Sequence, residues 1–287
     1  MNTMRPKPQI SLNLKILLCG FFLAILLFIL RSNMQPSKKT SFLRNNIHSD
    51  EENSTPATCT KLPSSLSQAL IHYSTSKITP QQTFSEISVS AKVLLKRSPC
   101  NFLVFGLGYD SLMWASLNHG GRTVFLEEDK SWIEQIQKKF PSLESYHVKY
   151  DSKITEAENL MKIGNEEKCK VVSDPRYTKC DLALKGLPAD IYETEWDLIM
   201  VDAPTGYHKE APGRMKAIYT AGLFARNREE GETNVFVHDI NRSVEDKFSM
   251  AFLCDGYMIE EEGRIRHFTI PSHRTSLNDK PFCPPSK

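Results

Sequence analysis

The chain has 287 residues, of which 40% are hydrophobic and 24% are charged, so one large or two small globular domains are expected. Its formal net charge is only +2, and no basic stripe with interleaved aromatic residues is present, which argues against nucleic-acid binding. No internal repeat of roughly 20–50 residues is evident, which argues against a solenoid or a propeller.

An uncharged run near the N-terminus, "ILLCGFFLAILLFIL" at 16–30, lies between Lys15 and Arg31. As a helix it would be about 22 Å long, which is short for a bilayer, but flanking cations can reach the membrane surface. A cleaved signal peptide is the alternative, since the length also suits one. No small-residue cleavage site follows in "RSNMQPSKKTS", which favours an uncleaved anchor. Cations on both sides leave its orientation open.

Residues 31–60 are polar, lack apolar periodicity and indicate a flexible stem after the anchor. Asn53 begins a glycosylation sequon, which weakly favours a lumenal location for the rest of the chain. Of the seven cysteines, Cys19 lies in the apolar run. The other six cysteines are an even number, which is compatible with disulfides in an oxidising compartment and equally with unpaired core cysteines. Cys169 and Cys180 are the first pair to test, because they bracket a loop-like segment.

Two helices are expected at 63–73 and 79–97, the second with Thr79 as N-cap and Gln82 closing a capping box. Apolar runs then predict strands at 102–105, 123–126, 146–150, 196–202 and 234–239, alternating with helices at 110–118, 130–140 and 213–228. A hairpin is expected at 256–270, with its turn at Glu262-Gly263. This order predicts an α/β fold with a mainly parallel sheet. A terminal antiparallel pair is typical of S-adenosylmethionine (SAM) methyltransferases.

A glycine-containing loop, "VFGLGYDS", ends the first predicted strand, where Gly106 and Gly108 allow a sharp turn and close approach of a ligand. A dinucleotide fingerprint would place a third glycine at Ser111. Asp110 would repel a pyrophosphate but suits a cationic cofactor without phosphates, such as SAM. Glu127 ends the next strand about 20 residues later, where a carboxylate can bind both ribose hydroxyls. A plain tight turn is the alternative reading of the glycines.

Polar residues also follow the fourth and fifth predicted strands. Asp202 ends the fourth, and His238, Asp239 and Asn241 follow the fifth, so all should meet at one edge of the sheet. Asp202, Asp239 and Asn241 form a plausible site for a hard divalent cation, and the alternative for Asp202 is an aspartate that only turns the chain. His208 or His238 would suit a general base, unless either is structural.

Long segments of the chain resemble the plant glucuronoxylan 4-O-methyltransferase family, among them "CNFLVFGLGYDSLMWASLNHGGRTVFLEED", "WDLIMVDAPTGYHKEAPGRM" and "VFVHDINR". The resemblance implies a Rossmann-like class I SAM methyltransferase domain. It implies a single-pass type II Golgi membrane protein with a cytosolic tail at 1–15, an anchor at 16–30, a stem at 31–60 and a lumenal domain at 61–287. The implied activity is methyl transfer from SAM to O-4 of glucuronic acid on xylan of the secondary wall.

The resemblance also assigns roles to single residues. Gly106 and Gly108 would form the SAM loop, and Glu127 would bind the ribose. Asp202 with the His238-Asp239 pair would form the catalytic edge. Catechol-type O-methyltransferases, a looser analogy, carry a lysine where this chain has Thr205, which moves the base to His208 or His238.

The acidic sugar would need fixed cations, and Arg214 and Arg242 are nearest to the predicted edge, although solvated surface arginines are the alternative. Two other functions stay open at this point. A Golgi glycosyltransferase shares the anchor, stem and domain layout, but Glu127-Glu128-Asp129 lacks the Asp-x-Asp pattern of such enzymes. A non-catalytic xylan-assembly protein that keeps the methyltransferase fold is the second alternative.

Overall fold

The computed structural model describes residues 63–274 and 280–285. The predicted tail, anchor and stem, with the sequon at Asn53, lie outside the described residues. Within the described part of the chain, none of the helices has the length and apolar character needed to cross a bilayer. The described residues belong to one compact unit.

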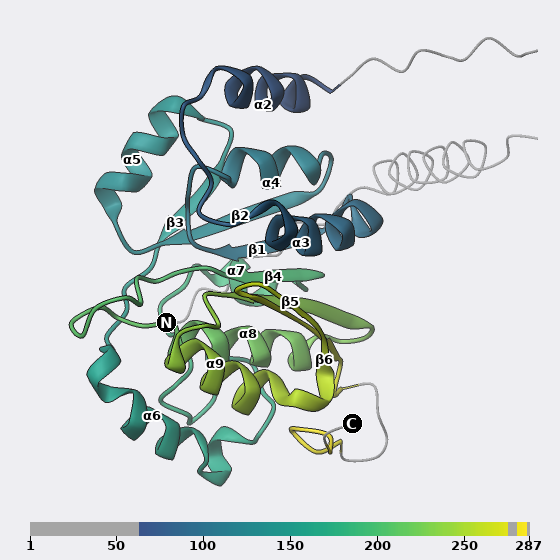
Figure 1. The fold of residues 1–287 in the computed structure, drawn as a ribbon. Helices are drawn as coiled ribbons and strands as arrows, with labels where there is room; N and C mark the ends of the chain where they lie inside the picture. The colour runs from purple at the N-terminus through teal and green to yellow at the C-terminus, as the bar shows by residue number, and fades with distance from the viewer. Residues whose placement is uncertain (1–62, 275–279, 286–287) are drawn as a thin grey trace, which may run out of the picture. The chain divides into compact units, whose positions relative to one another are not determined.

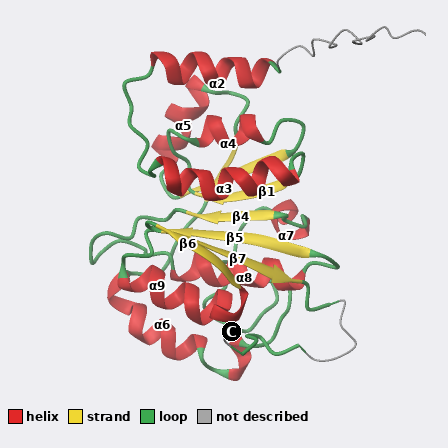
Figure 2. Cartoon of the chain, turned by 45° about the vertical axis from the view of Figure 1, so that its right-hand side comes forward, coloured by secondary structure: helices red, strands yellow, loops and turns green. Residues whose placement is uncertain are grey.

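A seven-stranded sheet in the order β3-β2-β1-β4-β5-β7-β6 forms the centre of this unit (Figure 2). Strands β1 to β5 are parallel, whereas β7 runs antiparallel to both β5 and β6. The sheet confirms the predicted Rossmann-like methyltransferase fold, mainly parallel with a terminal antiparallel hairpin. The strands are β1 Asn101–Phe105, β2 Arg122–Glu127, β3 Glu144–His147, β4 Leu198–Val201, β5 Glu232–His238, β6 Met258–Glu262 and β7 Ile265–Pro271.

Helices cover both faces of the sheet (Figure 1). One face carries α3 Phe84–Arg97, α4 Ser111–Leu117 and α5 Lys130–Lys139, with α2 Ser64–Thr75 packed on α4. The other face carries α6 Ala157–Gly164, α7 Ala189–Glu193, α8 Met215–Asn227 and α9 Ser243–Ser249. Short 3-10 segments lie at Ile154–Glu156, Glu167–Cys169 and Asp255–Tyr257, and a π-helical turn at Met250–Cys254.

The central strands are apolar at successive positions because each face of the sheet is covered. In β1, Phe102 and Val104 are buried among the helices of the α3 face, and Leu103 and Phe105 are buried among those of the α8 face. This pattern produced the near-continuous apolar runs that the sequence showed. The third strand lies at Glu144–His147, slightly before its predicted range of 146–150.

The start of α3 differs from the prediction. Thr83, not Thr79, is the N-cap: its side chain accepts a hydrogen bond from the Glu86 nitrogen, and a Glu86 carboxylate oxygen accepts one from the Thr83 nitrogen at 2.7 Å. Glu86 is therefore the residue that closes the capping box, and the prediction for Thr79 and Gln82 was wrong. The segment before Thr83 is not helical, and Thr79, Pro80, Gln81 and Gln82 line a cavity at the edge of the sheet. At α5, Asp129 is the N-cap, and its side chain accepts hydrogen bonds from the Ser131 and Trp132 nitrogens.

Two disulfides are formed among the described residues. The first joins Cys169 and Cys180, as predicted, and the second joins Cys254 and Cys283. The second one holds the C-terminal segment over Arg226 of α8, a fully buried cation. The Arg226 guanidinium donates to the Phe282 carbonyl at 3.0 Å and lies 4.0 Å from the Phe282 ring centroid. Backbone carbonyls and aromatic rings thus stabilise this charge.

Candidate functional site

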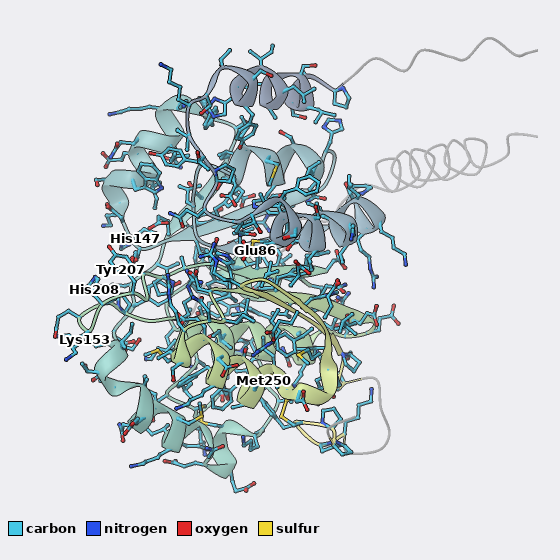
Figure 3. All side chains as sticks on the ribbon, viewed as in Figure 1. Glu86, His147, Lys153, Tyr207, His208 and Met250 are labelled. Carbon is cyan, nitrogen blue, oxygen red and sulfur yellow. A yellow bond between two sulfur atoms is a disulfide. The ribbon has the colours of Figure 1, made fainter. Side chains whose placement is uncertain are left out.

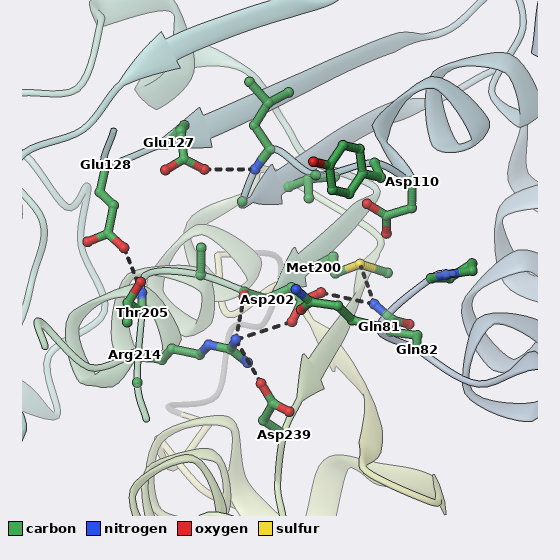
Figure 4. Close-up of a pocket in the computed structure, with 18 of the residues that line it drawn as sticks. Gln81, Gln82, Asp110, Glu127, Glu128, Met200, Asp202, Thr205, Arg214 and Asp239 are labelled. Carbon is green, nitrogen blue, oxygen red and sulfur yellow. Dashed lines mark hydrogen bonds and ion pairs between the residues drawn. The ribbon is translucent and has the colours of Figure 1, made fainter. Parts of the chain in front are cut away.

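A cavity of about 450 Å³ lies at the edge where β1, β2, β4 and β5 end (Figure 4). The strands are parallel and in register, so the residues that follow them are brought to one side of the sheet. The lining includes most of the predicted site residues: Gly106, Gly108, Asp110, Glu127, Asp202, Arg214, Asp239 and Arg242. The residues predicted to meet at this edge of the sheet therefore line one common cavity.

The loop after β1 and the acid at the end of β2 are joined directly. Gly106 has a φ of 128°, and a Cβ atom at this position would lie 3.3 Å from the Ala203 Cβ, so a glycine is required. The Leu107 nitrogen donates to one Glu127 carboxylate oxygen at 3.1 Å, and the Asp129 nitrogen donates to the other at 3.0 Å. Each oxygen keeps a further lone pair for a ligand hydroxyl. Burial raises the pKa of Glu127, although the backbone donors oppose this.

Asp110 places a second acid at the start of α4. One of its oxygens accepts a hydrogen bond from the Trp114 indole nitrogen at 2.8 Å, and the side chain lines the cavity beside Gly108. Burial, together with the negative charge of Asp202, raises the pKa of Asp110 to about 6. The group therefore titrates near neutral pH, and its ionised form would attract a cationic ligand.

Asp202 is the central acceptor at the end of β4. It accepts hydrogen bonds from His238 Nδ1 at 2.9 Å and Gln82 Nε2 at 3.1 Å. Burial alone would raise the pKa of Asp202, but the hydrogen bond from His238 and the positive charge of Arg214 outweigh it and lower the pKa. His238 is only 1% exposed and is not among the residues that line the cavity. Asp202 therefore faces the cavity, and His238 lies behind the Asp202 carboxylate.

Asp239, after β5, is surrounded by guanidinium groups. Its carboxylate lies 2.9 Å from Arg214, 3.0 Å from Arg242 and 3.0 Å from Arg264. Its backbone has a φ of 61°, in the left-handed region that only a few non-glycine residues adopt. The three contacts hold the carboxylate in this orientation. Arg242 keeps a side-chain exposure of 29% and so remains accessible to a ligand from the cavity.

Arg214 is buried and bonds to residues at the ends of both β4 and β5. It donates to the carbonyl of His238 at 2.8 Å, to the carbonyl of Pro204 at 3.2 Å and to the carbonyl of Asp202. It also lies 3.2 Å from the Asp202 carboxylate. Arg214 thus holds the two strand ends together. Because its guanidinium is engaged in these contacts, it is less available to a substrate carboxylate.

Besides His238, which lies behind Asp202, two predicted site residues do not line the cavity. His208 is exposed on the loop after β4, and Asn241 is exposed after β5, and neither lines the cavity. The His208 ring instead contacts Tyr207, with ring centroids 5.0 Å apart. The two residues follow different strands, and spacing along the sequence could not reveal that neither reaches the cavity. The structure gives no support to the base role of His208 or the ligand role of Asn241.

A divalent cation does not fit this arrangement. Asp202, His238 and Asp239 offer ligand atoms within 4.8 Å of one another, but Asn241 is not part of that group. The Arg214 guanidinium already lies between the two carboxylates, at 3.2 Å and 2.9 Å. A cation would have to displace this positive charge, so the reaction proposed below has no step that passes through a metal ion.

Sequence reasoning missed several residues of the site. Gln82 bonds to Asp202, and Arg264 in the β6–β7 turn links Asp239 to Glu86 on α3, at 3.0 Å and 3.3 Å. These residues come from segments far apart in the chain, so no local spacing signals their convergence. Glu128 is a further such residue: it accepts a hydrogen bond from the Thr205 nitrogen at 2.8 Å. It connects the β2 end to the loop after β4.

Known proteins match the chain over nearly its whole length. Glucuronoxylan 4-O-methyltransferase 3 of Arabidopsis thaliana is 62% identical over 98% of each chain, and glucuronoxylan 4-O-methyltransferase 2 of the same plant is 64% identical over 98% of each chain. Arabinogalactan O-methyltransferase 2 of Arabidopsis thaliana is 54% identical over 75% of this chain and 77% of that protein.

Solved structures resemble the chain less. A methyltransferase-like protein from Silicibacter pomeroyi aligns with 69% of this chain and 91% of its own at 16% identity, with a TM-score of 0.37, which is too low to bear on function.

The family model described as IRX15/IRX15L/GXM matches residues 85–268, which include the four strand ends around the cavity. The resemblance seen in the sequence is confirmed: the chain belongs to the IRX15/IRX15L/GXM family, with the glucuronoxylan 4-O-methyltransferases among its close relatives.

Proposed function

We propose that the protein transfers the methyl group of SAM to O-4 of glucuronic acid substituents on glucuronoxylan. The names of the relatives at 62% and 64% identity support the reaction and the acceptor. The observation that carries the proposal is a shared cavity lined by Asp110 and Glu127, from the ends of β1 and β2, and by Asp202 and Arg242, which follow β4 and β5. The first pair suits a cationic nucleoside, and the second suits an acidic sugar.

The β1–β2 half of the cavity would bind SAM. Gly106 and Gly108 let the backbone approach the ligand closely, and Glu127 would accept hydrogen bonds from both ribose hydroxyls. Ionised Asp110 would attract the positively charged methionyl end. SAM supplies a methyl group on a sulfonium sulfur, which a hydroxyl oxygen can attack in line.

The β4–β5 half would bind the acceptor. Arg242 would hold the uronate, since a guanidinium can pair with a carboxylate through two parallel hydrogen bonds. Asp202 would orient the 4-hydroxyl and accept its proton as the oxygen bonds to the methyl carbon and the carbon–sulfur bond breaks. His238, at 2.9 Å from Asp202, would position that carboxylate from behind rather than act as the base itself.

The cellular location belongs to the same proposal. An anchor at 16–30 would hold the protein in the Golgi membrane as a single-pass type II protein, with the domain from residue 61 onward in the lumen. The two disulfides are consistent with an oxidising compartment. Protection of the domain from added protease in intact Golgi vesicles tests this orientation, and cleavage without detergent would contradict it.

The function is tested by incubating the purified chain with methyl-labelled SAM and either glucuronoxylan or an arabinogalactan. We expect label on O-4 of glucuronic acid in glucuronoxylan, with much less in arabinogalactan. A chain that binds SAM but labels neither polymer would favour a non-catalytic assembly protein. Binding of a sugar nucleotide in place of SAM would favour a glycosyltransferase.

Glu127→Ala is expected to weaken SAM binding at least tenfold, because two hydrogen bonds to a carboxylate are lost. Isothermal titration calorimetry with SAM measures the change. Glu134→Ala, an exposed residue on α5, is the matched control and should bind as the wild type does. Equal affinity of the Glu127 variant and the wild type would reject the ribose role.

SAM affinity is expected to fall as the pH drops below about 6, where Asp110 becomes protonated and loses its attraction for a cation. The decrease approaches tenfold per pH unit below the pKa, since binding then requires loss of one proton. Asp110→Asn should bind SAM weakly at every pH, with the dependence removed. A wild-type affinity that stays constant between pH 7 and about pH 5 would contradict the assignment.

Asp202→Asn is expected to lower kcat by at least about a hundredfold while the affinity for SAM stays within a few-fold of wild type. The change removes the proton acceptor and places an amide opposite the donors His238 and Arg214. Single-turnover rates and SAM titrations measure the two effects separately. An Asp202 variant with normal kcat would exclude its catalytic role.

A further inference from the structure

The loop after β4, residues 203–213, is fixed at its base and projects at its tip. The Thr205 nitrogen donates to Glu128 at 2.8 Å, and the Gly213 nitrogen donates to the Thr205 carbonyl at 2.9 Å. On its other side, the Ile154 nitrogen donates to the Ala211 carbonyl at 2.9 Å. These bonds tie the base of the loop to the end of β2, to itself and to the segment before α6.

Tyr207 lies in the exposed part of this loop, beside His208 (Figure 3), and its side chain belongs to the cavity lining. It is 77% exposed, yet it belongs to the cavity lining together with Gly206 and Arg242. Its ring contacts that of His208 edge-on, with an interplanar angle of 76°. Tyr177 is exposed to nearly the same degree, 76%, but does not line the cavity. Exposure alone therefore does not distinguish Tyr207; its place at the cavity mouth does.

The groups deeper in the cavity would be occupied by the reacting sugar. The side chains of Asp202 and Arg242 are 20% and 29% exposed, far less than Tyr207. A glucuronic acid bound between them would leave the xylan backbone outside, at the level of Tyr207. Xylose rings present flat faces of C–H groups, and the electron-rich face of an aromatic ring attracts such groups. A tyrosine also offers this area at a small cost in side-chain entropy.

We propose that Tyr207 is a stacking platform for a xylose unit of the xylan backbone next to the substituted one. The platform deepens the proposed function and rests on it, since it names the part of the acceptor that the cavity mouth recognises. Tyr207 would raise affinity for a polymer over a single uronosyl-xylose, without contact to the reacting atoms. It is a specificity determinant, not a catalytic residue.

The test compares Tyr207→Ala with Tyr207→Phe, which keeps the ring, and with Tyr177→Ala as the control for losing an exposed tyrosine. The full-length chain is assayed with two acceptors: glucuronic acid linked to one xylose, and the same unit within a xylo-oligosaccharide that extends in both directions. For the long acceptor, Tyr207→Ala should raise KM about tenfold, with kcat and the SAM Kd unchanged. For the short acceptor its KM should equal that of the wild type.

Tyr207→Phe and Tyr177→Ala should match the wild type on both acceptors. An unchanged KM of Tyr207→Ala for the long acceptor, or equal rises for the two acceptors, would overturn the platform and leave the methyl transfer intact. Absence of methyl transfer by the wild-type chain would instead overturn the proposed function and the platform with it.

Discussion

The edge of the sheet depends on one buried guanidinium. Arg214 lies between the carboxylates of Asp202 and Asp239 and donates to carbonyls at the ends of β4 and β5. Two carboxylates this close in a buried setting would repel each other and carry a large desolvation cost. The arginine offsets both effects and connects two strands whose ends carry the polar groups of the site. Arg214 thus contacts the Asp202 and Asp239 carboxylates and the His238 carbonyl at once.

The cavity consists of two halves that different parts of the chain supply. The β1–β2 half offers glycine backbone and the acids Asp110 and Glu127, and the β4–β5 half offers Asp202 and arginines. Glu128 joins the halves, because it follows Glu127 on β2 and bonds to Thr205 on the loop after β4. A rearrangement at the first half can therefore alter the second. Relatives named for xylan and for arabinogalactan are both similar to this chain over most of its length.

Much of the fold was predictable because its signals are local. Apolar runs predicted the strands, the glycines marked the turn after β1, and Glu127 was found by its distance from them. The remainder depends on tertiary contacts. From the sequence, Gln82 was predicted to close a capping box, but the structure forms that box with Thr83 and Glu86. Arg264 contacts Asp239 from a hairpin turn that is distant in the sequence. His238 was predicted as a candidate base, but its burial behind Asp202 depends on packing that no short sequence pattern records.

The C-terminal segment at 280–285 contributes Phe282 to the core. Phe282 covers the guanidinium of Arg226, and Cys283 is covalently bound to Cys254. Recombinant production in a reducing cytosol would leave this buried charge without its covalently held cover. A secretory expression host is therefore the better source of material. A purification tag fused downstream of Cys283 needs a spacer so that it does not disturb the Cys254–Cys283 disulfide or the contact between Phe282 and Arg226.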